Sequence, residues 1–348
     1  MNKEFLQKLL EVPSPSGNED LGVKLWREQF QSLPFKEYYK DKSGNLAFSV
    51  GRGETKLLLS GHIDEICMAI RGIQENGFII PIQMAGLDKK VLPGSEVLLL
   101  NDNLNVISGI VHKNPIHIEG SEKDQKDMAI SFEDLRIDIG VELREEVEKY
   151  GLHVGSPIIN GRHINLEHGP NRLYGNSLDD KSGVYIVEEV MMKLMEGPDQ
   201  EWKNKYTVIG LACTGEESGL LGAYRAAHQI NPDISIDIDV IHASDTGQFD
   251  TKKYGDIKLG KGPVIEWGQD KSRRLNKILK SMGIETQDGV SRIGGTNTKE
   301  FYLESADAET TLISIPLLSM HTPTETMDWR DINGAINLLT KSILECKL

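Results

Sequence analysis

One stretch of the chain decides the fold: Thr207-Val-Ile-Gly-Leu-Ala-Cys213-Thr-Gly-Glu216-Glu217-Ser-Gly219. Its apolar run to Cys213 predicts a buried strand, and the pattern from Gly219 to Gln229 predicts the helix that follows. Strands and helices that alternate in this way indicate an α/β domain. Ligands and catalytic groups gather at the carboxyl ends of strands in such sheets, so the Glu pair lies where chemistry is expected.

The same alternation extends to both ends of the chain. Toward the C-terminus, the sequence predicts helices at 183–195 and 329–346 and strands at 234–241 and 310–315. The first 60 residues predict an amphipathic helix, a second helix that Ser16 caps and that runs to Phe30, and strands at 45–50 and 56–60. The two ends together therefore predict one α/β domain.

Residues 69 to 166 have a different pattern. Short β-like runs at 78–80, 97–100 and 106–111 are separated by turn residues. A spacing of about 8 to 12 residues between such runs is typical of small β-barrels and sandwiches. The sequence therefore predicts a β-rich domain inserted between the two halves of the α/β domain.

Composition limits the partners and the compartment. The formal net charge of −14 argues against nucleic acid and anionic membranes, which both favour clustered Lys and Arg. The longest nearly apolar stretch, Thr311 to Met320, is about half of what a membrane-spanning helix needs. The N-terminal residues alternate charged and apolar side chains, unlike a signal peptide, so we expect a cytoplasmic protein. Cys67 and Cys213 lie in apolar runs, which predicts buried free thiols, and Cys346 has no CxxC partner.

Carboxylates or histidines follow apolar strands at five places. These places are His62-Ile-Asp64, Asp179-Asp180, Glu216-Glu217, Asp237-Ile-Asp239 with His242, and His321. A His-x-Asp after a strand suits a metal-binding imidazole with a carboxylate on its other nitrogen. Two adjacent Glu side chains repel each other unless a cation or a shared proton intervenes. A carboxylate inside an apolar run is costly unless it is paired or binds metal.

Each place taken alone has a structural explanation as well. His62 suits an ordinary loop histidine, and His242 suits a structural one. The acidic pairs suit helix starts, where carboxylates satisfy free backbone N–H groups. Taken together, two histidines, at least three carboxylates and one remaining Glu suit a pair of Zn²⁺- or Co²⁺-like ions bridged by a carboxylate and a water. No nucleophile elbow, Walker loop or dinucleotide fingerprint in the sequence competes with this interpretation.

The order His-x-Asp, Asp-Asp, Glu-Glu, Asp, His resembles that of the tetrahedral (glutamyl/deblocking) aminopeptidase family of dinuclear metallopeptidases. The similarity covers essentially the whole chain. It includes Pro13-Ser-Pro-Ser-Gly-Asn-Glu19, Asp41-Lys-Ser-Gly-Asn45, Ile137-Asp-Ile-Gly140, Gly155, Leu259-Gly-Lys-Gly-Pro263 and His321-Thr-Pro323. Five site motifs in the same order make the match specific.

The resemblance implies a role for each site residue. His62 and Asp239 are expected on one divalent ion, Glu217 and His321 on the other, and Asp179 between the two. Glu216 is expected to act as general base on a metal-bridging water, and Asp64 to orient His62. The peptide bond between Asp179 and Asp180 is expected to be cis. The implied cofactors are two Zn²⁺ or Co²⁺ ions per chain, and the implied reaction is hydrolysis of the N-terminal peptide bond of peptides.

The resemblance also implies the architecture. We expect a mixed-sheet α/β/α metallopeptidase domain from residues 1–68 and 167–348, and a barrel-like dimerisation domain at 69–166. Homo-oligomers, often dodecamers, are expected. The chain departs from the family pattern at Asn297, where Asp is common, and at Leu317 to Met320, where Arg-Tyr is common. These departures concern the side-chain pocket and subunit contacts, so no preferred N-terminal residue is transferred.

Three alternatives remain open at this point. A related dinuclear deacylase or carboxypeptidase would use similar ligands. A glycosidase would use paired carboxylates without a metal. A shell protein without catalytic metal would need none of the ligands, whereas every ligand position is present here.

Overall fold

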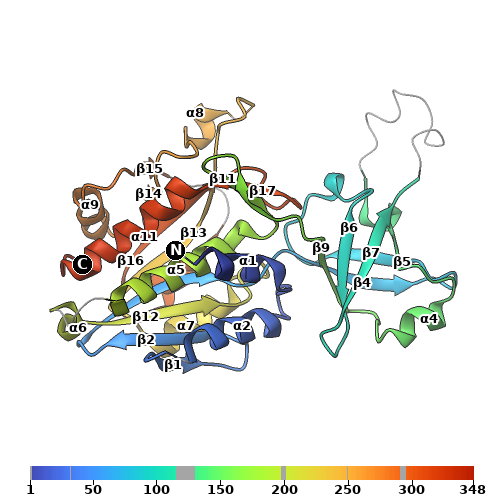
Figure 1. Cartoon of the computed structure of the whole chain (residues 1–348), viewed down its shortest axis with the longest axis horizontal. Coiled ribbons are helices and arrows are strands. Elements are labelled where there is room, and N and C mark those ends of the chain that lie inside the picture. The colour runs from blue at the N-terminus through green and yellow to red at the C-terminus, as the bar shows by residue number, and fades with distance from the viewer. Residues whose placement is uncertain (1, 32, 115–129, 197–200, 249, 291–294) are drawn as a thin grey trace. The chain divides into compact units, whose positions relative to one another are not determined.

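The computed structural model describes residues 2–31, 33–114, 130–196, 201–248, 250–290 and 295–348 (Figure 1). The chain divides into two compact units. The first consists of residues 1–64, 164–320 and 324–348, and the second of residues 65–163 and 321–323. The sequence predicts an inserted domain at residues 69–166. The second unit of the structure begins at Glu65, ends at His163 and also contains the segment 321–323.

The first unit is built on an eight-stranded sheet. In spatial order its strands are β1 (Lys36–Lys40), β2 (Leu46–Gly51), β12 (Tyr206–Cys213), β3 (Thr55–His62), β13 (Ile234–His242), β16 (Glu309–Leu317), β14 (Val264–Glu266) and β15 (Gln287–Gly289). The central strands β12, β3, β13 and β16 are parallel. Strands β1 and β2 pair antiparallel with their neighbours, and β14 pairs antiparallel with β16 but parallel with β15, so the predicted mixed sheet is confirmed.

Helices cover this sheet on both faces (Figure 1). One core includes α1 (Lys3–Glu11), α2 (Asp20–Gln31), α5 (Leu178–Glu196), α9 (Arg273–Ser281) and α11 (Trp329–Leu344). A separate core includes α7 (Leu221–Ile230) and α10 (Asn297–Glu304). The unit also contains α6 (Trp202–Lys205), α8 (Thr251–Tyr254) and a small sheet of β10 (Asn165–His168), β11 (Arg172–Gly175) and β17 (Glu325–Asp328).

The two cores explain why the central strands are apolar throughout. Successive side chains on a strand point to opposite faces of the sheet. In β3, Leu57 and Leu59 enter the core with α5, whereas Leu58 enters the core with α7. A strand buried on both faces needs apolar residues at every position, which produces the continuous runs seen in the sequence.

The second helix begins later than the sequence predicts. Ser16 does not cap it, because residues 15–18 form a turn in which the Asn18 N–H donates to Pro15 O and Gly17 has a φ of 87°. That left-handed conformation favours glycine and cannot continue into a helix. The helix therefore starts at Asp20, and the residues before it remain available for contacts near the site.

The second unit is a closed six-stranded barrel, which confirms the predicted β-barrel. Around the barrel the strands are β4 (Met68–Ile73), β5 (Ile79–Gln83), β8 (Arg136–Asp138), β7 (Val106–His112), β6 (Glu96–Leu100) and β9 (Pro157–Asn160). Short helices η1 (Lys89–Val91), η2 (Phe132–Asp134) and α4 (Arg144–Lys149) lie between them in sequence. Its core is separate from the cores of the first unit and includes Met68, Val97, Leu99 and Ile137.

Cys67, Cys213 and Cys346 are free cysteines, and the first two are buried, as predicted. Among the described residues, no helix is both long and apolar enough to cross a membrane.

Glu188 supplies a pH test of the fold. It lies on α5, is 1% exposed and accepts a hydrogen bond from Gln29 of α2. Burial raises the pKa of its carboxyl from 4.5 to about 7. The folded chain then holds this proton more tightly than the unfolded chain, so the free energy of unfolding falls as pH rises from about 4.5 to 7.

We predict that Glu188→Gln removes this part of the pH dependence, because Gln keeps the acceptor oxygen and does not ionise. The stability of the variant relative to the unmodified chain should rise by up to about 3 kcal/mol between pH 5 and pH 8. Urea unfolding at both pH values measures the difference. Glu54→Gln, at an exposed position, is the matched control. A pH-independent effect of Glu188→Gln would contradict the prediction.

Candidate active site

The parallel strands place the predicted site residues at one edge of the sheet. Parallel pairing aligns Cys213 with His62, so β12 and β3 end side by side. Strand β13, on the other side of β3, carries Asp239 near its own carboxyl end. The loop after β12, which contains Glu216 and Glu217, therefore begins next to His62, as expected for carboxyl ends of parallel strands.

His62 is the centre of this group. It is 1% exposed. Its Nε2 lies 3.2 Å from Asp179 Oδ1 and 3.9 Å from Glu216 Oε2. Its Nδ1 lies 3.1 Å from the main-chain oxygen of Asp64 and 3.5 Å from Asp64 Oδ1. A proton on Nδ1 can be donated to these oxygens, which leaves the Nε2 lone pair for a cation among the carboxylates.

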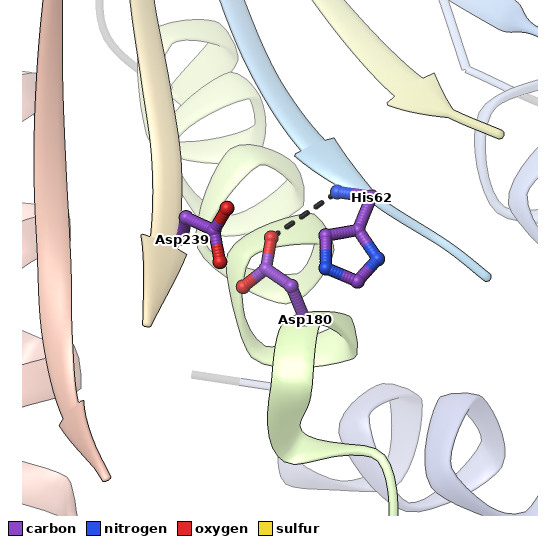
Figure 2. A group of neighbouring side chains, drawn as sticks. All are labelled: His62, Asp180 and Asp239. Carbon is purple, nitrogen blue, oxygen red and sulfur yellow. Dashed lines mark hydrogen bonds between the residues drawn. The ribbon is translucent and has the colours of Figure 1, made fainter. Parts of the chain in front are cut away.

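Asp180 lies beside His62 and is completely buried. Figure 2 shows its carboxylate between the end of β3 and Asp239 of β13. Its Oδ2 accepts the His62 main-chain N–H at 3.1 Å, and its Oδ1 accepts the Gly183 N–H at 2.9 Å. Asp180 thus fixes the start of α5 to the end of β3. The preceding peptide bond, Asp179–Asp180, is cis, as the family resemblance implies.

Asp64 holds the loop after β12. Its Oδ1 accepts the Glu216 N–H and its Oδ2 accepts the Glu217 N–H, both at 3.1 Å. Burial alone would raise the pKa of Asp64, but the hydrogen bond and the positive charge of His62 outweigh burial and lower it. One carboxylate therefore contacts both the imidazole and the backbone of the Glu pair.

The two aspartates of β13 have different environments. Asp237 accepts hydrogen bonds from Ser60 Oγ at 2.6 Å and from Thr298 N at 3.0 Å and Oγ1 at 3.2 Å. This pairing explains how a carboxylate is accommodated inside an apolar strand. Asp239 instead accepts the N–H of the adjacent Val240 and belongs to the cluster around His62. Of the two, Asp239 is therefore the candidate metal ligand.

The carboxylates of the cluster repel one another. Burial, followed by the charges of Asp239 and Glu217, raises the pKa of Glu216 to about 9, against the opposing effect of His62. Burial and neighbouring carboxylates also hold the pKa values of Asp180 and Asp239 well above their usual range. For His62, burial opposes protonation, but the charge of Glu216 and the hydrogen bond to Asp179 raise the imidazole pKa well above its usual value.

This donor set fits divalent cations. His62, Asp180 and Asp239 each offer one donor atom, and these atoms lie within 4.8 Å of one another. The same holds for His62, Glu216 and Glu217. Imidazole and carboxylate donors suit Zn²⁺ and similar ions, and a cation would relieve the repulsion that otherwise requires protons.

The structure brings six predicted residues together in the first unit: His62, Asp64, Asp179, Glu216, Glu217 and Asp239. His321 lies in the segment 321–323 of the second unit and has a φ of 62°. His242 is exposed at the end of β13 and belongs to neither of these two donor groups.

The sequence interpretation gave no role to three carboxylates near the site. Asp180 was visible only as the second member of the Asp-Asp pair. Glu325 of β17 accepts the Asp179 N–H at 3.1 Å, and Glu19 accepts the Gly215 N–H at 3.0 Å. Glu19 belongs to a motif shared with the family, which was the one signal for it. Glu325 had none beyond its position after His321.

A buried His–carboxylate cluster at the ends of parallel strands in a mixed α/β sheet is typical of metal-dependent hydrolases. The chain belongs to the M42 glutamyl aminopeptidase family, whose model matches residues 44–338. It is therefore an aminopeptidase of a metal-dependent family, as the motifs in the sequence predicted.

Individual relatives resemble the chain over nearly its whole length. A lysyl aminopeptidase of Pyrococcus furiosus is 27% identical over 98% of this chain and 96% of its own. The crystal structure of a TET aminopeptidase from a marine-sediment Thaumarchaeota archaeon has a TM-score of 0.91 at 25% identity, covering 99% of this chain and 96% of that one. The TET1 peptidase of Pyrococcus horikoshii, described as able to assemble into a tetrahedron or a large octahedral shell, has a TM-score of 0.84 at 27% identity and covers 99% of both chains.

Proposed function

We propose that this aminopeptidase removes N-terminal residues from peptides at a site for two divalent ions. The observation that supports this most directly is the buried group of mutually repelling carboxylates around His62. In the proposed arrangement His62 and Asp239 hold one ion, Glu217 and His321 hold the other, and Asp179 lies between them. Zn²⁺ or Co²⁺ bound there would lower the pKa of a water toward about 7 and stabilise negative charge on the scissile carbonyl.

Glu216 is the proposed general base. Its carboxylate is largely buried, and its Oε2 lies 3.9 Å from His62 Nε2, within the cluster rather than on the surface. There it would take a proton from the attacking water and deliver it to the leaving amine. Asp64 supports both roles, because it contacts the ring of His62 and the main chain of the Glu pair.

The substrate class is tested with aminoacyl-anilides and peptides. We predict hydrolysis of substrates with free N-termini when Zn²⁺, Co²⁺ or Mn²⁺ is added separately, and loss of activity with a chelator. The same peptides with acetylated N-termini are the matched control and should be cleaved far more slowly. Comparable rates on acetylated peptides would favour a deacylase or another peptidase. Activity that a chelator leaves unchanged would overturn the metal-dependent mechanism.

The two residues of the Glu pair have different proposed roles: Glu216 is the general base and Glu217 is a metal ligand. We predict that Glu216→Gln lowers kcat by at least about 10² to 10⁴, because Gln cannot transfer the proton. Metal loading of that variant should stay at the level of the unmodified chain, which we expect to reach two ions per chain. Glu217→Gln should lower metal loading, and excess metal should partly restore its activity. Elemental analysis and kcat measured across a metal titration give both results.

The two variants control for each other, since both replace an adjacent carboxylate with an isosteric amide. If Glu216→Gln kept most of its kcat, the proposed base would be wrong. If added metal rescued Glu216→Gln and not Glu217→Gln, the two roles would be reversed. Loading of the unmodified chain that never exceeds one ion would contradict the two-ion site.

We propose that the barrel unit is a dimerisation module. We also propose that the chain forms homo-oligomers larger than a dimer, such as a dodecamer. The barrel exposes several large apolar side chains, which an interface would remove from water. They include Met84, Val106, Leu143 and Val154. The similar TET1 peptidase of Pyrococcus horikoshii can assemble into a tetrahedron or a large octahedral shell, which supports the same proposal.

We therefore predict that light scattering at micromolar concentration gives a mass several times that of the 38.8 kDa chain. A charged residue at an exposed barrel position, as in Val154→Asp, should lower this mass because it places an unpaired charge in the interface. Glu54→Gln, in the other unit, should leave the mass unchanged. A monomeric mass for the unmodified chain would refute the prediction.

A further inference from the structure

The segment 14–19 contacts both loops that contain the proposed catalytic residues. Ser14 Oγ donates to the main-chain oxygen of Ile63 at 2.7 Å, next to His62 and Asp64. Ser16 Oγ donates to Ser218 Oγ at 2.9 Å, next to Glu217. The segment is short and precedes α2, where a turn replaces the predicted start of the helix. Its contacts are therefore with the site rather than within a helix.

Glu19 is the charged residue of this segment, and it is buried. Its side chain is 5% exposed, and its Oε1 accepts the Gly17 N–H at 2.7 Å and the Gly215 N–H at 3.0 Å. A buried carboxylate loses much of its hydration, a cost that hydrogen bonds only partly offset. Consistent with that cost, burial and then the charge of Asp64 raise the pKa of Glu19 to about 7.

Gly215 is the residue that sets the direction of the Glu pair. It directly precedes Glu216 and has a φ of 65°, in the left-handed region. Its N–H and the next two N–H groups, those of Glu216 and Glu217, are all held by buried carboxylates: the first by Glu19 and the other two by Asp64. Successive N–H groups next to a left-handed residue form a concave arrangement that binds negatively charged groups.

On the Glu19 side this loop forms part of the wall of a cavity. The cavity has a volume of about 740 Å³, and Glu19, Thr214, Gly215 and Ser218 are among the residues that line it. Hydrogen bonds to buried carboxylates restrain the loop beside this cavity. The bond from Gly215 to Glu19 is the restraint directly before Glu216, whose own N–H is held by Asp64.

We propose that Glu19 is a positioning residue: through its hydrogen bond to the Gly215 N–H it holds the loop that aims Glu216 and Glu217 into the site. The inference rests on the proposed function for the roles of the two glutamates. The hydrogen bond itself does not depend on that assignment, so it can be tested without substrate.

Two substitutions separate the hydrogen bond from the charge. Glu19→Gln keeps an oxygen that can accept both N–H groups, whereas Glu19→Ala removes it. In Glu19→Ala we expect hydrogen–deuterium exchange at the Gly215 amide to become about tenfold faster, because a buried hydrogen bond is lost. We also expect kcat to fall by about 10- to 100-fold, KM to change by less than about threefold, and metal affinity to weaken. Glu19→Gln should stay within about threefold of the unmodified chain in all these measurements.

Asp331 provides the matched control. Like Glu19, it is a buried carboxylate in the first unit that accepts hydrogen bonds from two glycine N–H groups. It is buried, and its two oxygens accept the Gly260 and Gly262 N–H groups, each at 2.7 Å. Burial raises its pKa to about 7, as in Glu19. Asp331→Ala should lower Tm by an amount similar to Glu19→Ala, but leave kcat and exchange at Gly215 within about twofold of the unmodified chain.

Three outcomes would overturn the proposal: unchanged exchange at Gly215 in Glu19→Ala, a kcat within twofold of the unmodified chain, or a Glu19→Gln variant as impaired as Glu19→Ala. The last would mean that the charge and not the hydrogen bond matters. Equal loss of kcat in Asp331→Ala would show a general effect of destabilisation and would also overturn it. If the unmodified chain hydrolyses no aminoacyl substrate, the proposed function fails, and exchange and metal affinity still decide the role of Glu19.

Discussion

The rest of the structure depends on one electrostatic constraint, the crowding of carboxylates around a single imidazole. Asp179, Asp180 and Asp239 all lie close to His62, and Glu216 follows at 3.9 Å. One imidazolium cannot neutralise so many buried negative charges, and burial strengthens their repulsion. The fold must therefore hold them in place until cations or protons compensate. Many of the hydrogen bonds near the site serve this purpose.

These carboxylates divide into those that hold the backbone and those that remain for the ions. Asp64 and Asp180 each accept two main-chain N–H groups, and Glu325 accepts one from Asp179. Apart from the local bond between Asp180 and Gly183, these bonds link segments that are far apart in the sequence. Asp179, Glu216 and Asp239 are then directed at the cluster by a rigid frame, which is what a metal site needs for a fixed ligand geometry.

Much of the fold could be predicted because its signals are local. Strand β12 and the helix after it follow directly from the apolar run to Cys213 and the glycine-flanked Glu pair. The site followed from the rule that strand ends meet at one edge. The start of α2 could not be predicted, since Ser16 is a good cap by type, and only the turn at Gly17 shows that the helix begins at Asp20.

The positioning carboxylates could not be predicted either, because their partners are remote. Asp180 meets the His62 N–H across 118 residues, and Glu19 meets the Gly215 N–H across 196 residues. No spacing rule relates such positions. A carboxylate that accepts backbone N–H groups also looks the same in sequence as a helix cap or a ligand. The sequence could therefore name the residue types of the site, while their division into ligands and supports required the structure.

The departure at Asn297 can be understood in the same electrostatic terms. Asn297 is 1% exposed at the start of α10, and the next residue, Thr298, donates its N–H to Asp237. Burial already raises the pKa of Asp237 to about 6, although Ser60 and Thr298 donate to it. An aspartate at position 297 would add a second buried charge one residue from that hydrogen bond, and like charges in a buried site destabilise each other. Asparagine has nearly the same shape as aspartate but no charge. It can therefore occupy the first position of α10 without adding negative charge near Asp237 of β13.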